Sequence, residues 1–328
     1  MPQISIIIPV YNGEKTIKET IESVLAQCFE DFEIIIINDG SEDSTLEVIA
    51  NISDPRIQVF SYPNAGLSVS RNRGFDHSCG RYIAFLDSDD LWKPDKLSKQ
   101  LKALHEHPQA AVAYSWTNFI DEFSNFVRIG SRVTITGNVY PNLLLGNFLE
   151  SGSNALVCRH ALAEVGGFDE SLRAAEDWEI WLRLSQKYDF VAVPHPHVLY
   201  RLSTHSMSTN VLQQEVACVQ VMEQAFSKAP ASLQSLKRCS ASNLYKYLTY
   251  RSLEGYPKRA TSFLAIQYLW KAIGYSPNLL FSKISVKVLL KVVLIAILPP
   301  KKSYFLITKY KKIFNTSSLL GQIQVQGV

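Results

Sequence analysis

Cysteine is scarce in this chain and follows no pattern. The 328 residues include five cysteines: Cys28, Cys79, Cys158, Cys218 and Cys239. They form neither a CxxC pair, nor a zinc-ligand spacing, nor a disulfide framework, which excludes a disulfide-stapled secreted domain and a zinc module. A reducing, cytoplasmic location is therefore expected. No basic stretch precedes the first apolar run, so the N-terminus predicts no signal peptide.

Charged residues are also few, at 19% against 47% apolar and 11% aromatic residues, which excludes a disordered chain. The net charge of +3 hides a division along the sequence. Residues 1–223 carry 17 Lys and Arg against 29 Asp and Glu, a net charge of −12, whereas residues 224–328 carry 16 against 1, a net charge of +15. The acidic part argues against a nucleic-acid substrate. The basic part predicts an anionic partner, which is a bilayer surface in preference to nucleic acid or an acidic protein.

The sequence lacks an apolar run long enough to cross a bilayer, which takes about 20 residues. The best candidate, residues 286–298, holds seven uninterrupted apolar residues after Lys291, and Pro299 ends it. Seven lysines interrupt it or follow it: Lys287, Lys291, Lys301, Lys302, Lys309, Lys311 and Lys312. This composition is typical of a helix that lies in the membrane interface. The alternative is a buried helix with a solvated lysine edge.

Short β-rich runs alternate with helical patterns over the first ninety residues. Strands are expected at 4–8, 32–37, 57–60 and 82–86, with helices at 15–27, from 43, and at 67–78. Further on, the pattern predicts a helix at 94–105, a strand at 111–116, a β-rich segment at 126–136 and a helix after the glycine pair at 166–167. Strands that are apolar on both faces predict a sheet between helices, with ligands at the carboxyl ends of the strands. We expect an α/β domain over 1–207 and a mostly helical, basic region over 208–328.

Three carboxylates, Asp87, Asp89 and Asp90, follow the strand expected at 82–86. Carboxylates held close together either raise one another's pKa or are neutralised by a cation. Mg²⁺ and Mn²⁺ take oxygen ligands, commonly one or two carboxylates together with substrate phosphates, so the cluster favours phosphate chemistry. The alternative is a solvated acidic turn that caps the next helix.

Polar residues also follow the first two expected strands. Tyr11 can offer its ring to a base, and Asp39 can accept a hydrogen bond from a base N–H, although both segments also fit ordinary turns. Arg71, after a Gly- and Ser-containing loop, is available for a base edge or a phosphate, or is a surface cation. Glu176 and Asp177 form a carboxylate pair at an expected helix N-terminus, which is a helix cap or a base.

Taken in order, these segments resemble the inverting glycosyltransferases of family 2, which have the GT-A nucleotide-sugar fold. The resemblance covers about residues 4–205 and rests on seven segments, at 9–12, 23–27, 38–41, 64–72, 80–94, 166–170 and 176–178. It implies a mixed α/β sheet flanked by helices. It also implies a metal-dependent enzyme that moves a sugar from a nucleoside-diphosphate donor, usually UDP-linked, to a glycan or lipid-linked acceptor, as in surface polysaccharide synthesis.

The resemblance assigns residues of three segments to the nucleotide-sugar site. Tyr11, Asp39 and Arg71 would hold the nucleotide base, and Pro9 and Asn12 would belong to the same nucleotide-sugar site.

It also assigns roles to the carboxylates. Asp87 would approach the ribose or the metal, and Asp89 would bind Mn²⁺ or Mg²⁺ on the diphosphate. Asp177 would be the catalytic base, and Glu176 would act beside it in the nucleotide-sugar site, where it orients the acceptor or a loop.

One departure from the family concerns the segment after Tyr200. Many relatives carry a His two residues after the Arg of a Tyr-Arg pair, whereas here Leu202 and Ser203 follow Arg201. His205 is therefore not assigned as a metal ligand, and Arg201 becomes a candidate phosphate contact. With the basic C-terminal part, these features predict a peripheral protein at the inner face of the membrane that binds no nucleic acid.

Two other functions stay open from the sequence. A catalytically silent sugar-nucleotide-binding or scaffold protein is disfavoured because Asp39, Asp89 and Asp177 are all present. A nucleotidyltransferase that makes sugar nucleotides is disfavoured because no Gly-rich, basic phosphate loop follows the first strand.

Overall fold

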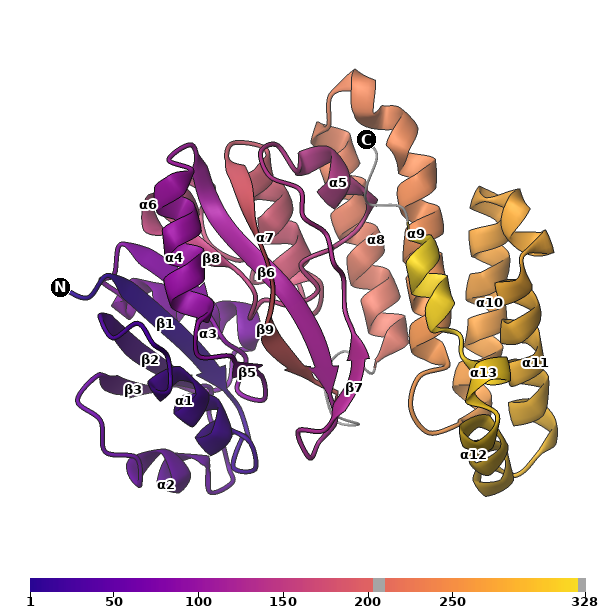
Figure 1. The fold of residues 1–328 in the computed structure, drawn as a ribbon, viewed down its shortest axis with the longest axis horizontal. Helices are drawn as coiled ribbons and strands as arrows, with labels where there is room; N and C mark the ends of the chain where they lie inside the picture. The colour runs from indigo at the N-terminus through magenta and orange to yellow at the C-terminus, as the bar shows by residue number, and fades with distance from the viewer. Residues whose placement is uncertain (203–209, 324–328) are drawn as a thin grey trace. The chain divides into compact units, whose positions relative to one another are not determined.

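The computed structural model describes residues 1–202 and 210–323 (Figure 1). The chain divides into two compact units: unit 1 is Met1–Leu143 with Asn147–Ser203, and unit 2 is Leu144–Gly146 with Thr204–Val328. The expected boundary between 207 and 208 falls outside the described residues and stays a prediction. His205 lies outside them as well.

Unit 1 is built on a mixed sheet whose strand order is β3-β2-β1-β4-β8-β6-β9-β5, with β7 paired to β6. Its strands are β1 (Ile4–Val10), β2 (Phe32–Asn38), β3 (Ile57–Ser61), β4 (Tyr82–Phe85), β5 (Leu91–Trp92), β6 (Ala110–Ile120), β7 (Phe126–Ile129), β8 (Leu156–Cys158) and β9 (Asp189–Arg201). The strands β1 to β4 run parallel to one another, and β8 runs antiparallel to β4 and β6. The alternation of strands and helices in the first ninety residues is thus confirmed as a parallel, doubly wound half-sheet.

Helices cover both faces of this half-sheet. The helices that lie wholly in unit 1 are α1 (Ile17–Leu25), α2 (Thr45–Ala50), α3 (Leu67–His77), α4 (Lys96–Glu106), α6 (Arg159–Val165) and α7 (Glu176–Ser185), and α5 (Tyr140–Leu145) crosses the boundary between the units. Ile4, Ile6 and Ile8 of β1 share one core cluster with the apolar sides of α1 and α4. Since side chains alternate along a strand, Ile7 faces the other side, where α3 packs. Every residue of β1 and β2 is buried as a result.

The packing of α3 on β1 depends on one glycine. A Cβ atom at Gly74 would lie 2.3 Å from Cγ2 of Ile7, which is closer than two carbon atoms can approach. The helix therefore lies directly on the strand. This close approach sets the position of the preceding turn of α3, which carries Arg71.

The second half of the sheet departs from the expected pattern. The strands β8 and β9 were not predicted, and the β-rich segment expected at 126–136 forms a strand only at Phe126–Ile129. Strand β9 contains Pro194 and Pro196, which cannot donate backbone hydrogen bonds, and its register with β6 shifts beside Trp116. Long pairing with β6 forms this strand in spite of its local sequence.

Unit 2 is mostly helical, as the sequence predicts. Its main helices are α8 (Val211–Lys228), α9 (Lys237–Ser252), α10 (Arg259–Tyr275), α11 (Lys283–Ile297), α12 (Pro300–Lys309) and α13 (Lys311–Phe314). They enclose a separate core that includes Leu248, Tyr268, Leu269, Val288 and Val292. None of the helices in the described residues is long and apolar enough to span a membrane.

Candidate active site

The candidate site lies where β1, β2 and β4 end. The pairing of Val10 with Asn38 and of Ile7 with Phe85 brings the three carboxyl ends to one edge of the sheet. Pro9 is buried within β1, while the Tyr11 side chain that follows is 50% exposed. The sheet therefore brings the predicted base-binding segments and the acidic turn side by side.

The loops after β1 and β2 are tied to each other. The backbone N–H of Asn12 donates to Oγ of Ser41 at 2.9 Å, and its side-chain Oδ1 accepts from the N–H of Glu42 at 2.8 Å. Asn12 adopts a positive φ of 51°, which asparagine tolerates better than most residues. This connection leaves the Tyr11 ring facing solvent, where a base can stack on it.

Asp39 fixes the entrance to α3. Its side chain is 4% exposed, and its two carboxylate oxygens accept from the backbone N–H groups of Ala65, at 3.0 Å, and Gly66, at 2.8 Å. The guanidinium of Arg73 lies 3.4 Å from the same carboxylate. Gly66 has a φ of 100°, a conformation that favours glycine. Asp39 thus orders the loop that leads to Arg71. Its Oδ1 accepts from both Ala65 and Arg73, whereas its Oδ2 accepts from Gly66 and keeps a second lone pair for a base N–H.

Arg71 connects the end of β4 to the start of α7. It is 1% exposed, and its Nη2 donates to Oδ1 of Asp87 at 2.6 Å while its Nη1 donates to Oε1 of Glu176 at 2.9 Å. Burial alone would lower the pKa of Arg71, but the carboxylates of Asp87 and Glu176 raise it above its ordinary value. A Cβ atom at Gly152 would lie 2.6 Å from Nη2, so the guanidinium is closely packed. The contact with a base stays a prediction, and the structure adds a role as a cross-link.

The acidic turn after β4 is not the solvated cap that the sequence left open. Asp90 is buried, and its carboxylate accepts from Oγ of Ser153 at 2.6 Å and from the backbone N–H of Arg201 at 3.0 Å. Burial, followed by the charges of Asp89 and Asp87, raises the pKa of Asp90 well above its ordinary value. Burial and the charge of Asp87 also raise the pKa of Asp89, to about 6.

The carboxylate oxygens of this turn suit a divalent cation that also binds the oxygens of a diphosphate. Within residues 1–202 and 210–323, no three His, Cys, Asp or Glu side chains form a group that could hold a metal ion. The carboxylates of Asp87 and Asp89, two residues apart in this turn, could nevertheless supply the one or two oxygen ligands that Mg²⁺ commonly takes from a protein. The remaining ligands would be phosphate oxygens and water.

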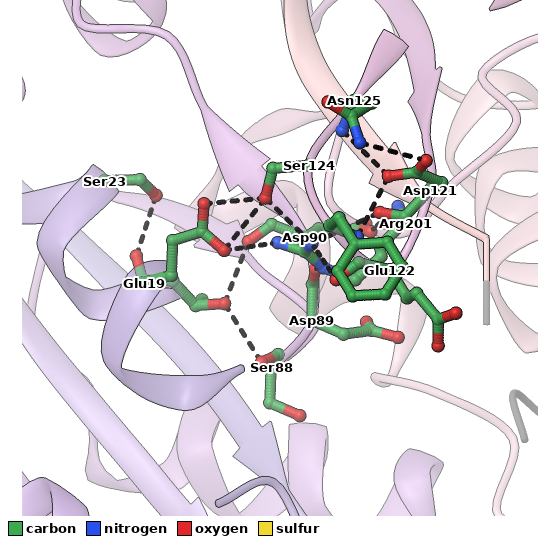
Figure 2. Close-up of polar contacts among 12 residues, drawn as sticks. Glu19, Ser23, Ser88, Asp89, Asp90, Asp121, Glu122, Ser124, Asn125 and Arg201 are labelled. Atoms are coloured by element: carbon green, nitrogen blue, oxygen red, sulfur yellow. Dashed lines mark hydrogen bonds and ion pairs between the residues drawn. The ribbon is translucent and has the colours of Figure 1, made fainter. Parts of the chain in front are cut away.

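Arg201, at the end of β9, forms hydrogen bonds that fix the main chain of the acidic turn (Figure 2). Its guanidinium is 3% exposed and donates from Nε to the carbonyl of Asp89 at 2.7 Å and from Nη2 to Oε2 of Glu19 at 2.7 Å. Its Nη1 reaches Oγ of Ser124 at 2.9 Å and the carbonyls of residues 121 and 122 at 3.3 Å. The guanidinium is therefore buried and engaged in hydrogen bonds within the protein. This geometry contradicts the hypothesis that Arg201 contacts phosphate.

The same cluster joins α1 to the turn and to the tip of the β6–β7 hairpin. Oγ of Ser124 donates to the Glu19 carboxylate at 2.8 Å, and Oγ1 of Thr20 lies 3.0 Å from the carbonyls of Ser88 and Asp90. None of the dashed contacts in Figure 2 ends on the Asp89 carboxylate. The main chain of the turn is thus fixed, while this carboxylate keeps its ligand capacity.

Asp177 is the second residue of α7 and follows Glu176. Its Oδ1 accepts from the backbone N–H of Trp178 at 2.7 Å, and its Oδ2 accepts from Nδ2 of Asn147 at 2.9 Å. Burial, followed by the charge of Glu176, raises the pKa of Asp177 to about 6, against the opposing effects of Arg71 and these hydrogen bonds. Asn147 was not predicted because it belongs to no motif and lies 30 residues before Asp177.

The structure therefore brings most of the predicted residues together. Arg71 forms ion pairs with Asp87 and Glu176, and its charge opposes the rise in the pKa of Asp177. The charge of Asp87 contributes to the raised pKa of Asp89. The residues that sequence reasoning missed, among them Asn147, Ser153 and Asp90 as an anchor, are the partners that hold this group in place.

Comparisons with known proteins identify the family and the fold. The profile of the family described as glycosyltransferase like family 2 matches residues 5–252. A Rickettsia bellii protein, named only as a glycosyltransferase, is 37% identical over 188 residues, which are 56% of this chain and 26% of that protein. The chain thus spans about a quarter of that relative. TuaG of Bacillus subtilis, named for teichuronic acid biosynthesis, is 32% identical over 214 residues, which are 64% of this chain and 82% of TuaG.

Solved structures share the fold. TarS from S. aureus in complex with UDP has a TM-score of 0.61 at 20% identity, over 98% of this chain and 92% of that one. A mannosyltransferase from Pyrobaculum calidifontis, in complex with GDP-Man and Mn²⁺, has a TM-score of 0.58 at 17% identity, over 98% and 88%. At this identity the likeness concerns the arrangement of strands and helices.

Proposed function

Since the chain belongs to the glycosyltransferase-like family 2 and is a glycosyltransferase with the GT-A fold, we propose that it transfers a sugar with inversion from a nucleoside-diphosphate donor. The acceptor would be a hydroxyl of a glycan or of a lipid-linked saccharide in surface polysaccharide synthesis, the setting for which TuaG is named. The structural neighbours were solved in complex with UDP or GDP-Man, and we propose UDP as the nucleotide of the donor.

One observation carries this proposal, the cross-link through Arg71. It holds Asp87, at the donor end of the site, and Glu176, beside the proposed base, on one guanidinium. A general base works best with a pKa near the operating pH, and the pKa of Asp177 of about 6 leaves this carboxylate ionised at pH 7. Asp177 can then accept the proton of the acceptor hydroxyl as that oxygen attacks the anomeric carbon. Attack from the face opposite the diphosphate inverts the configuration.

The donor would be held by residues of three strand ends. Tyr11 would stack on the base, Asp39 would accept from a base N–H, and Asp89, with Asp87 beside it, would hold Mn²⁺ or Mg²⁺. When bound, the cation supplies stabilisation of the negative charge that develops on the leaving diphosphate.

The roles of the two carboxylates can be separated by substitution. We expect Asp89→Ala to weaken Mn²⁺-dependent binding of a UDP-sugar, measured by calorimetry. Asp177→Asn should preserve donor binding and lower transfer by about 10² to 10⁴-fold, measured as release of UDP, because a general base contributes a factor of that size.

Asp31→Asn is the matched control, since Asp31 is exposed and lies before β2, outside the proposed site. Near-normal turnover of Asp177→Asn would show that Asp177 is not the base. Donor binding by the unsubstituted protein without transfer to any acceptor of a broad panel would favour a catalytically silent sugar-nucleotide-binding protein instead.

The location of the reaction is also a proposal. All five cysteines are free thiols, which suits a reducing compartment, and residues 224–328 carry a net charge of +15. We therefore propose a peripheral position at the cytoplasmic, inner face of the membrane, where anionic lipids would attract the basic region and lipid-linked acceptors are within reach.

A further inference from the structure

One face of α11 is apolar and exposed. Val286, Leu289, Leu290, Val293 and Ile297 are between 41% and 69% exposed, and their spacing places them on one side of the helix. We name these five residues the outer stripe. An apolar face of this kind that remains exposed marks an interaction surface rather than an ordinary solvated side.

The opposite face of α11 already has its packing partners. Ile284, Val288, Val292 and Ile295 are buried in the core of unit 2. The outer stripe is therefore not a displaced core face. The helix is apolar on two sides, and only one of them is covered within the described residues.

Lysines border the outer stripe. Lys283, Lys287 and Lys291 recur every four residues along one flank of α11, and Lys301 and Lys302 are exposed at the start of α12. Burial lowers the pKa of Lys291 to about 8, which still leaves most of this amine charged at pH 7.

Acidic residues are almost absent from this part of the chain. The one acid of residues 224–328 is Glu254, and its carboxylate pairs with Arg251. A partner surface must therefore be apolar where it meets the outer stripe and anionic around it. A second copy of unit 2 would bring one basic surface against another, so charge argues against self-association through this face.

We infer that the outer stripe lies in the headgroup region of an anionic bilayer, with the exposed lysines Lys283, Lys301 and Lys302 against lipid phosphates. This inference rests on the proposed position at the inner face of the membrane. The 15 residues of α11 measure about 22 Å, shorter than the roughly 30 Å of a bilayer core, so the helix lies in the plane of the membrane. Exposed aromatic side chains at Trp270 and Phe281 suit the same interface.

Binding of this kind has two separable parts. Attraction between lysines and anionic lipids is screened by salt, whereas burial of the outer stripe in the interface is not. The two parts can therefore be removed independently, by substitution of the lysines or of the stripe.

The experiment measures co-sedimentation of the full chain with vesicles of phosphatidylglycerol and phosphatidylcholine (1:3) and of phosphatidylcholine alone. We expect binding to the anionic vesicles that weakens more than tenfold when salt is raised from low to about 0.3 M. Leu290→Ser/Val293→Ser/Ile297→Ser should weaken binding more than tenfold at both salt concentrations. Lys283→Gln/Lys301→Gln/Lys302→Gln should weaken it at low salt and flatten the salt dependence.

Leu212→Ser/Val216→Ser is the matched control, because these exposed apolar residues lie on α8, away from the outer stripe in sequence. It should bind as the unsubstituted chain does. Circular dichroism shows whether each variant keeps its helices. Since the substituted side chains are exposed, we expect unchanged melting temperatures.

Three outcomes would overturn the inference: equal binding to neutral and anionic vesicles, unchanged binding of the folded stripe variant, or a dimer in ultracentrifugation that the stripe variant abolishes while no vesicle is bound. Transfer to a water-soluble acceptor tests the proposed function separately. The stripe variant should retain that transfer, so failure of one proposal leaves the other in place.

Discussion

Three carboxylates of the site, Asp89, Asp90 and Asp177, all have a raised pKa, yet their hydrogen bonds separate their roles. Asp90 accepts from Ser153 and from the backbone of Arg201, so it anchors the turn. The Asp177 carboxylate accepts from the Asn147 amide and from the backbone N–H of Trp178. These two uncharged donors hold the carboxylate in place. The Asp89 carboxylate keeps its oxygens for a ligand. Three carboxylates whose pKa is raised by burial can thus serve as anchor, base and ligand.

Asn147 positions the proposed base. Its amide N–H stabilises the charged form of Asp177, so Asn147→Leu should raise the pKa of Asp177 further. The base works only when deprotonated, and the acidic limb of kcat/KM against pH should therefore move to higher pH, by about one unit for a hydrogen bond to a charged group. The measurement is a pH profile between 5 and 9 with KM for the donor unchanged. An unshifted profile with lower amplitude would mean that Asn147 has only a structural role.

We expect that even the substitution of Arg71 by lysine is not tolerated in the site. A guanidinium can bind two carboxylates from different elements at once, whereas an ammonium is a point charge that loses this planar geometry. Breaking a buried pair costs about 3–5 kcal/mol, so Arg71→Met should lower the free energy of unfolding by about that amount in urea titrations. Arg71→Lys should fold better than Arg71→Met and still lose transfer. Full activity of Arg71→Lys would contradict the cross-link as the basis of the site.

At the scale of elements, the apolar periodicity of the sequence predicts those strands and helices that have a clear local pattern. The strands β1 and β2 and the helix α1 have continuous or amphipathic apolar patterns, and all three form where expected. The strand β9 does not have such a pattern, because it contains prolines and histidines. It forms through its pairing with β6 and with β5. The contacts of Arg201 escape sequence analysis for the same reason, since its partners come from α1, from the turn after β4 and from the β6–β7 hairpin.

The β6–β7 hairpin should be coupled to the acidic turn through Arg201. In Arg201→Lys the hydrogen bonds to the Asp89 carbonyl and to the hairpin tip cannot all form, so we expect faster hydrogen exchange in residues 119–129. The apparent affinity for Mn²⁺ should fall more than kcat, because the turn loses its support while the base is untouched. Arg56→Lys is the control, since Arg56 pairs with Asp54 on a separate loop. Unchanged exchange and unchanged metal affinity would leave Arg201 with no positioning role.

Over the whole molecule, the division of charge along the sequence, between residues 223 and 224, falls 20 residues after the division into two units, between Ser203 and Thr204. The net negative charge lies in the unit that holds the sheet and its site, and the net positive charge lies in the unit whose helices enclose their own apolar cluster. The charge pattern along the sequence predicts two parts, whereas the apolar content alone allows one large core or two smaller ones. Neither predicts which side chains of α11 remain outside, since that depends on how the helices pack.

Two separate cores predict two separable unfolding events. Four of the five tryptophans lie in unit 1, and Trp270 is the fifth, so in Trp270→Phe the fluorescence reports unit 1 alone. A ligand at 100 times its Kd stabilises the folded state by about 2.7 kcal/mol, which for a unit of this size raises the melting temperature by roughly 5–10 °C. UDP with Mn²⁺ should shift the fluorescence transition by this amount. The far-ultraviolet signal, to which the helices of both units contribute, should show a second midpoint that the ligand does not shift. A single transition that shifts in both signals would show that the chain unfolds as one cooperative body.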